Sequence, residues 1–143
     1  MRVYVASSWR NERQPEVVAA LRAADYEVYD FRHSGYHDTG FHWSEIDSHW
    51  KEWTPEQFRA SLIHPIAQRG YKTDFEALRN CDACVLVMPC GRSAHLELGW
   101  AAGNGKFTGI LLADGEPELM YSMVDFLSAN MEELLEDLQM YES

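Results

Sequence analysis

A six-residue apolar run, Ala83–Met88, is the feature that most constrains what this chain can fold into. Val3–Ala6, near the start, is a similar run, and in neither do charged residues alternate with apolar ones. A strand that is apolar on both faces is typical of a parallel sheet covered by helices on both sides. The two runs therefore predict an α/β fold in which helices connect parallel strands.

Helical patterns separate the apolar runs. Pro15 suits a first helical turn, and Val17, Val18 and Leu21 then form one apolar stripe. At the other end of the chain, Asn130 is well placed to cap a last amphipathic helix. The predicted strands are Val3–Ala6, Tyr26–Tyr29, Ala83–Met88, Phe107–Leu112 and, more weakly, Met123–Leu127.

Five strands alternating with helices predict a single domain over residues 1–143, with a doubly wound parallel sheet of order 2-1-3-4-5. Right-handed crossovers then place the first and third strands side by side. The loops Ala6–Gln14 and Pro89–Ser93 should therefore face each other across a crevice at one edge of the sheet.

An aromatic segment, Phe41–Trp53, stands out from the rest of the chain and follows an irregular loop expected over residues 30–40. Its tryptophans recur at three- and four-residue spacing, and Ser44 with Asp47 resembles a capping box, so we expect a helical insert at about 41–63. Thr54 starts a second helix within it. The aromatic stripe fits a core or subunit contact as well as a platform for a base.

Two carboxylates are expected near helix starts. Ser93 is a candidate cap that puts Glu97 four positions into a helix, where the dipole favours negative charge. Glu97 could then act as a nucleophile or an anchor, or simply stabilise its helix. Thr73 is a candidate cap for a helix that begins at Asp74.

The turn before Glu97 offers groups that suit a phosphate. Gly91 permits close approach of the backbone, and Arg92 and Ser93 add a guanidinium and a hydroxyl. Ser93 fits a plain helix cap equally well, and His95 either contacts a sugar hydroxyl or faces solvent. The spacing and lysine of a P-loop are missing.

The charge and composition of the chain argue against several classes of binding partner. A net charge of −11 argues against binding a nucleic-acid polymer, which needs clustered Lys and Arg. No apolar run reaches eighteen residues and no signal-peptide pattern is present, so we expect a cytoplasmic protein without a membrane partner. Cys81 and Cys84 have no second pair to complete a zinc site, and we interpret them as buried thiols with no metal.

Three segments together carry a family resemblance: Val3–Trp9, Asp74–Val85 and Ser93–Ala101. The last contains Glu97, Gly99 and Ala101 in a Glu-x-Gly-x-Ala pattern on a predicted helix. In order and spacing the chain resembles the nucleoside 2-deoxyribosyltransferase family, including its nucleotide N-glycosidase branch.

The resemblance implies a flavodoxin-like fold and cleavage or transfer at the N-glycosidic bond of a nucleoside or nucleoside 5′-monophosphate. It assigns Glu97 as the nucleophile that forms a glycosyl-enzyme, Asp74 as the carboxylate that binds the base, and Tyr4 as the tyrosine beside the nucleophile. It implies no metal or organic cofactor, and a homo-oligomer. The residues assigned to substrate binding are Ser7, Trp9, Asp82, Gly91, Arg92, Ser93 and His95.

One position departs from the family pattern. Gly91 stands about where the transferases carry an aspartate that recognises deoxyribose, which favours a phosphorylated ligand. Two other functions stay open at this point: a non-catalytic nucleotide-binding module, and an activity like that of NAD glycohydrolases.

Overall fold

The computed structural model describes residues 1–34 and 40–142, so residues 35–39 of the expected irregular loop lie outside the described part. The chain divides into two compact units. The first comprises residues 1–30 and 78–143, and the second comprises residues 31–77, which include the predicted insert. None of the described helices combines the length and apolar character that crossing a membrane requires.

The first unit is built on a five-stranded sheet in which every strand pairs in parallel. The strand order β2-β1-β3-β4-β5 confirms the predicted topology. The strands are β1 (Arg2–Ala6), β2 (Glu27–Asp30), β3 (Ala83–Val87), β4 (Phe107–Leu111) and β5 (Phe126–Ser128).

The last strand begins later than the sequence predicted. Met123 belongs to a short 3₁₀ helix, η4 (Leu119–Met123), and not to β5. Pairing starts only after Asp125, whose backbone N–H donates to Thr108 O at 2.9 Å and whose Oδ2 accepts from Thr108 N at 2.8 Å. These two hydrogen bonds between Asp125 and Thr108 set the register in which Phe126 lies opposite Gly109.

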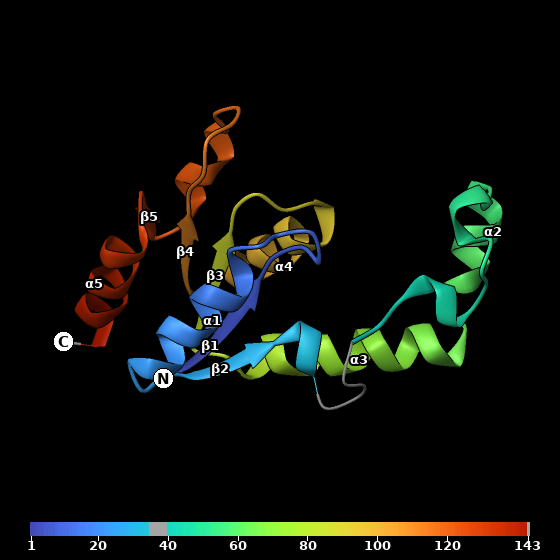
Figure 1. Cartoon of the computed structure of the whole chain (residues 1–143), viewed down its shortest axis with the longest axis horizontal. Helices are drawn as coiled ribbons and strands as arrows, with labels where there is room; N and C mark the ends of the chain where they lie inside the picture. The colour runs from blue at the N-terminus through green and yellow to red at the C-terminus, as the bar shows by residue number, and fades with distance from the viewer. Residues whose placement is uncertain (35–39, 143) are drawn as a thin grey trace. The chain divides into compact units, whose positions relative to one another are not determined.

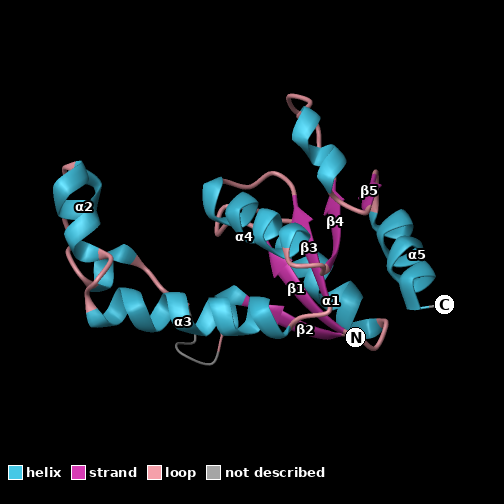
Figure 2. Cartoon of the chain, turned by 180° about the vertical axis from the view of Figure 1, so that it is seen from behind, coloured by secondary structure: helices cyan, strands magenta, loops and turns pink. Residues whose placement is uncertain are grey.

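Helices cover both faces of this sheet, as Figures 1 and 2 show from opposite sides. Side chains alternate along each strand, so Val3, Val5 and Val85 point to one face, where they pack in one apolar cluster. The helices α1 (Gln14–Ala23) and α5 (Met131–Glu142) complete that cluster. The cap predicted for α5 is confirmed, since Asn130 Oδ1 accepts from Glu133 N at 2.9 Å.

The opposite face carries Tyr4, Cys84 and Leu86, which are all fully buried. Helix α4 (Arg92–Gly103) contacts β1, β3 and β4, and it buries Ala94, Leu98 and Ala101. This is the face on which the candidate site lies.

In the second unit, α2 (Pro55–Ser61) begins as predicted. Thr54 Oγ1 accepts from Gln57 N at 3.2 Å, and Gln57 Oε1 accepts from Thr54 N at 2.8 Å, which completes a capping box. The next helix, α3 (Pro65–Asn80), ends in the first unit and starts much earlier than predicted. Thr73 is therefore not a cap: it lies inside α3 and its hydroxyl donates to Arg69 O at 2.8 Å.

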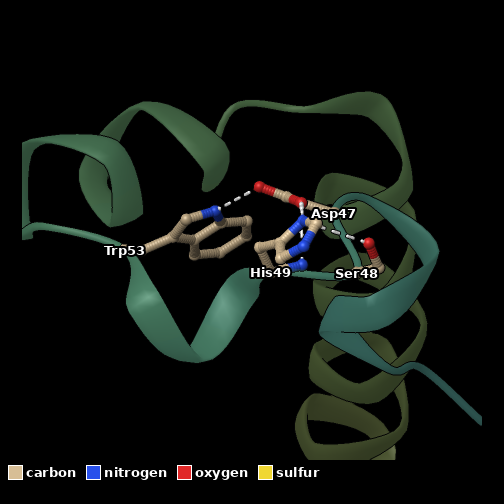
Figure 3. A network of polar contacts seen from close by, with 4 residues as sticks. All are labelled: Asp47, Ser48, His49 and Trp53. Carbon is tan, nitrogen blue, oxygen red and sulfur yellow. Dashed lines mark hydrogen bonds and ion pairs between the residues drawn. The ribbon is translucent and has the colours of Figure 1, made fainter.

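The aromatic stripe is not one helix, contrary to the prediction. It forms two 3₁₀ turns, η2 (Trp43–Glu45) and η3 (Trp50–Glu52). The side chain of Asp47 is the physical reason, because it accepts from His49 N and from Trp53 Nε1, each at 2.8 Å (Figure 3). Short polar side chains that bind the backbone in this way compete with helix formation. The predicted Ser44–Asp47 box is replaced by a bond from His42 N to Glu45 Oε2 at 2.8 Å.

Candidate functional site

The candidate site is centred on a contact between Tyr4 and Glu97, two residues that are far apart in the sequence. Tyr4 lies in the middle of β1, is 1% exposed, and stacks on Tyr29 with ring centroids 5.2 Å apart. Its hydroxyl donates a hydrogen bond to Glu97 Oε2. A buried phenol thus holds the carboxylate of a half-buried glutamate against the sheet.

Glu97 reaches this position because α4 starts close to the end of β3. The cap of α4 is Gly91, which makes no side-chain cap hydrogen bond, and the helix begins at Arg92. The predicted Ser93 cap is wrong: Ser93 is the second helical residue, and Glu97 is therefore in the second turn. That turn lies between the buried residues Ala94 and Leu98, so Glu97 is carried beside the sheet and not at the helix tip.

The loop after β1 binds the turn after β3. Ser7 Oγ donates to Val87 O at 3.0 Å, and Asn11 Nδ2 donates to Val87 O at 2.9 Å and to Pro89 O at 3.0 Å. Arg13 Nη1 donates to Met88 O at 3.2 Å. These bonds confirm that the two loops meet at the switch point of the sheet, as the topology predicted.

Sequence reasoning missed Asn11 and Arg13. Asn11 is 2% exposed, and Arg13 also reaches Leu112 O at 3.0 Å, beyond β4. Their partners are backbone carbonyls that are distant in the sequence, and carbonyls leave no signature in the residue pattern. The only available signal was their place in a polar loop at the switch point.

The charge of Glu97 acts on two thiols. Burial, and after it the negative charge of Glu97, raise the pKa of Cys90 to about 11. The pKa of Cys84 is raised well above its usual value, first by burial and then by the negative charges of Cys81 and Glu97. Burial is also the largest cause that raises the pKa of Cys81 to about 11. Cys81 and Cys84 are free and buried, as the sequence predicted.

His95 is turned toward η4. Its Nδ1 lies 2.8 Å from Gly91 O and its Nε2 lies 2.7 Å from Tyr121 Oη, with the two rings stacked at 5.7 Å. Because a carbonyl can only accept, Nδ1 carries the hydrogen and Nε2 accepts from the tyrosine hydroxyl in the neutral ring. His95 and Tyr121 line a pocket of about 350 Å³ between α4 and η4, together with Leu98 and Met123.

The other predicted residues have different surroundings. Asp82 Oδ2 accepts from Arg2 N at 2.7 Å, at the edge of the sheet where the strands begin. Trp9 is exposed in the loop after β1, and Arg92 and Ser93 are exposed in the first turn of α4. Asp74 is half-buried on α3, in the second unit. Among residues 1–34 and 40–142, no three His, Cys, Asp or Glu side chains gather as a metal site would require.

Comparison with known proteins places the fold. No protein-family model and no curated protein matches the chain. Among solved structures, a 2-deoxyribosyltransferase from Bacillus psychrosaccharolyticus matches with a TM-score of 0.63 at 19% identity, over 94% of this chain and 90% of its own. The CMP N-glycosidase BcmB of Clostridium botulinum matches with a TM-score of 0.55 at 19% identity, over 97% and 99%. The chain shares a flavodoxin-like α/β fold with both.

Proposed function

We propose that this chain is an enzyme that cleaves or transfers at the N-glycosidic bond of a nucleoside or nucleoside 5′-monophosphate, with Glu97 as the nucleophile. The observation that carries the proposal is the hydrogen bond from buried Tyr4 to Glu97 Oε2. A carboxylate that is fixed in rotation by a buried donor is suited to in-line attack on a bound carbon atom. The two enzymes that share the fold are named for this chemistry, one as a transferase and one as a glycosidase.

The proposed reaction has two steps. A carboxylate oxygen of Glu97 attacks the anomeric carbon, the carbon–nitrogen bond breaks, and the base leaves with the bonding electron pair and takes up a proton. The sugar is then held as an ester on Glu97. Water or a second base attacks the same carbon, loses a proton and releases the carboxylate, so two inversions give net retention. We assign to Asp74 the hydrogen bond to the base and the handling of its proton.

The turn at the start of α4 supports a phosphorylated substrate. Gly91 provides no side chain to cap the helix, so the N–H groups of the first turn are the natural partners of an anion. Arg92 and Ser93 are exposed on that turn and add a guanidinium and a hydroxyl. We propose that they bind the 5′-phosphate. The name of BcmB, a CMP N-glycosidase, agrees with a nucleoside monophosphate as substrate.

The remaining assignments follow from position. We propose that Ser7 and Trp9, in the loop after β1, and His95, on α4, lie around the sugar and base. The structure gives Asp82 a backbone partner, Arg2 N, and we propose for it a supporting role at the start of β3. We keep the cytoplasm as the proposed location.

The test is the release of free base. The protein is incubated with ribo- and deoxyribonucleosides and their 5′-monophosphates, with and without a free acceptor base, and products are separated by chromatography. Glu97→Gln keeps the size of the side chain and removes its charge, and Glu136→Gln does the same at an exposed site on α5. Base release that Glu97→Gln abolishes and Glu136→Gln leaves intact supports the proposal. Tight nucleotide binding without turnover would replace it with a binding module.

A further inference from the structure

His95 is held at both edges of its ring by groups from different segments. Its Nδ1 lies 2.8 Å from Gly91 O, at the start of α4, and its Nε2 lies 2.7 Å from Tyr121 Oη, on η4. The rings of His95 and Tyr121 stack with their centroids 5.7 Å apart and their planes 18° from parallel. Both ring nitrogens are thus engaged within the protein, so the ring acts on a ligand through the groups that it holds.

The two hydrogen bonds require the same tautomer of His95. The carbonyl of Gly91 can only accept, so Nδ1 carries the hydrogen, and Nε2 accepts from the hydroxyl of Tyr121. The sulfur atoms in reach are weaker acceptors and lie farther away: Cys90 Sγ is 3.8 Å from Nδ1, and Met88 Sδ is 3.4 Å from the hydroxyl oxygen. Burial is the first cause that raises the pKa of Tyr121, so its hydroxyl keeps the proton that this arrangement needs.

Tyr121 can serve as an anchor because η4 is held at both ends. At the first end, Glu118 Oε1 accepts from Met120 N at 3.2 Å. Beyond the other end, Asp125 and Thr108 form the two hydrogen bonds that start the pairing of β5. The hydroxyl of Tyr121 is therefore presented to His95 from a fixed turn.

The bond from His95 fixes the first peptide of α4. Gly91 makes no side-chain cap hydrogen bond, and a side chain at this position would meet nothing within 4 Å. Neither a cap nor packing beside its Cα therefore holds this glycine, whose backbone has the greatest freedom of any residue. In a trans peptide the N–H points away from the preceding carbonyl, so holding Gly91 O aims the N–H of Arg92 out of the helix start. An anion approaches a helix from that direction.

We propose that Tyr121 is a positioning residue for the turn at the start of α4. Its hydroxyl sets the tautomer of His95, and Nδ1–H of His95 holds the Gly91 carbonyl so that the N–H groups of the first turn face the ligand. Tyr121 itself makes no contact with the ligand and acts through His95. The inference rests on the proposed binding of a 5′-phosphate at this turn, and it adds the two side chains that orient the turn.

The tautomer is measured on the unmodified protein by nuclear magnetic resonance. Long-range correlation of ring hydrogens with ring nitrogens at pH 8 shows which nitrogen carries the hydrogen. The signals of His95 are those that are missing in His95→Asn. We expect the hydrogen on Nδ1. A hydrogen on Nε2 would overturn the inference, because the ring would then have no donor for the Gly91 carbonyl.

Binding shows whether the two side chains act on the turn. The dissociation constants of CMP and cytidine are measured by calorimetry, with Glu97→Gln in every protein to prevent turnover, and their ratio gives the preference for phosphate. His95→Asn retains an amide nitrogen near the position of Nδ1, whereas His95→Gln retains one near the position of Nε2. His95→Asn should therefore keep the preference within about twofold, and His95→Gln and Tyr121→Phe should lower it roughly three- to tenfold.

Tyr141→Phe is the matched control, because it removes a tyrosine hydroxyl from α5 at a site that is 52% exposed. It should leave the preference unchanged. Equal losses in His95→Asn and His95→Gln would assign the ring to packing alone and overturn the inference. An unchanged preference in Tyr121→Phe would also overturn it, as would equal binding of CMP and cytidine when His95 and Tyr121 are both present. These readouts need no turnover, so the expected binding without any base release would contradict the proposed function alone.

Discussion

The hydroxyl of Tyr4 donates to Oε2 of Glu97, and this one bond joins the middle of β1 to the second turn of α4. Neither residue needs the other for its own secondary structure. Tyr4 is buried by the sheet and by Tyr29, and Glu97 is placed by a helix whose own residues Ala94 and Leu98 are buried. A buried donor aimed at a carboxylate is the arrangement that a positioned nucleophile requires.

Tyr4→Phe should keep the fold and lower activity. The ring and its packing on Tyr29 remain, but the carboxylate loses the hydrogen bond from the Tyr4 hydroxyl. A hydrogen bond to a charged group contributes about 1.5–3 kcal/mol, which corresponds to roughly a 10- to 100-fold loss of kcat/KM. Steady-state kinetics measures the effect.

The control for that variant is Tyr26→Phe. It removes another tyrosine hydroxyl in the first unit, on the side of the sheet covered by α1 and α5. Tyr26→Phe should leave kcat/KM unchanged. Equal losses in the two variants would show that Tyr4 acts through stability alone.

The thiol of Cys90 should report the charge of Glu97. Its pKa is about 11, so it is protonated at neutral pH and should react slowly with iodoacetamide. Glu97→Gln removes the negative charge, which lowers the pKa of Cys90 and raises the thiolate fraction, while burial keeps the pKa above its usual value. Alkylation of Cys90 at pH 8 should therefore be faster in the variant, as followed by peptide mass spectrometry.

Cys81 is the internal control for this measurement. Burial is the main cause of its raised pKa, and the charges that act on it are those of Lys106 and Asp82. Its alkylation should be the same in both proteins. A Cys90 rate that Glu97→Gln leaves unchanged would mean that Glu97 carries no charge beside that thiol.

Asn11→Ala should destabilise the first unit. The change removes both donors to the carbonyls of Val87 and Pro89 at a site that is 2% exposed. Val87 O keeps the bond from Ser7 Oγ, so the change removes two hydrogen bonds without leaving that carbonyl unpaired, which costs about 1–3 kcal/mol in the free energy of unfolding. Asn104→Ala is the control, since its amide binds Trp100 O at an exposed position and should change stability little. Denaturant unfolding measures the stability of both variants. Equal effects would contradict the stabilising role of the bonds from Asn11 to the turn after β3.

Arg92→Ala should weaken the binding of nucleoside monophosphates and leave that of nucleosides unchanged. If Arg92 binds the 5′-phosphate, the KM for nucleoside monophosphates should rise about tenfold or more. The reason is that a hydrogen bond between charged groups contributes about 1.5–3 kcal/mol to binding. The kinetics with nucleosides should not change. Arg22→Ala, at an exposed position on α1, should affect neither substrate. A KM that rises equally for both substrate classes would assign Arg92 to another role.

The sheet was predictable because its signal is local. Ala83–Met88 is apolar on both faces, and that pattern together with the alternation of elements leads to the order 2-1-3-4-5. Glu97 was singled out by its place on a predicted helix and Tyr4 by the family resemblance, and their catalytic roles stay predictions. Their contact could not be derived from spacing, because it depends on how α4 packs on the sheet.

The predicted helix boundaries were wrong at residues whose side chains suit more than one structural role. Ser93 and Thr73 are typical cap residues, yet Gly91 caps α4 and Thr73 binds a carbonyl inside α3. The spacing of Trp43 to Trp53 fits a helix, but the bonds of Asp47 to His49 N and Trp53 Nε1 favour turns. The propensity of a residue allows several local structures, and its contacts in the folded chain decide which of them forms.

The covalent intermediate is the most direct test of the account. The protein is incubated with a 2-fluoro-substituted nucleoside monophosphate, which slows release of the sugar, and the product is measured by intact mass and peptide mapping. We expect a mass increase of one fluorinated sugar phosphate, located on the peptide that contains Glu97 and absent in Glu97→Gln. A label on any other residue, or base release with no labelled enzyme at any time, would contradict Glu97 as the nucleophile.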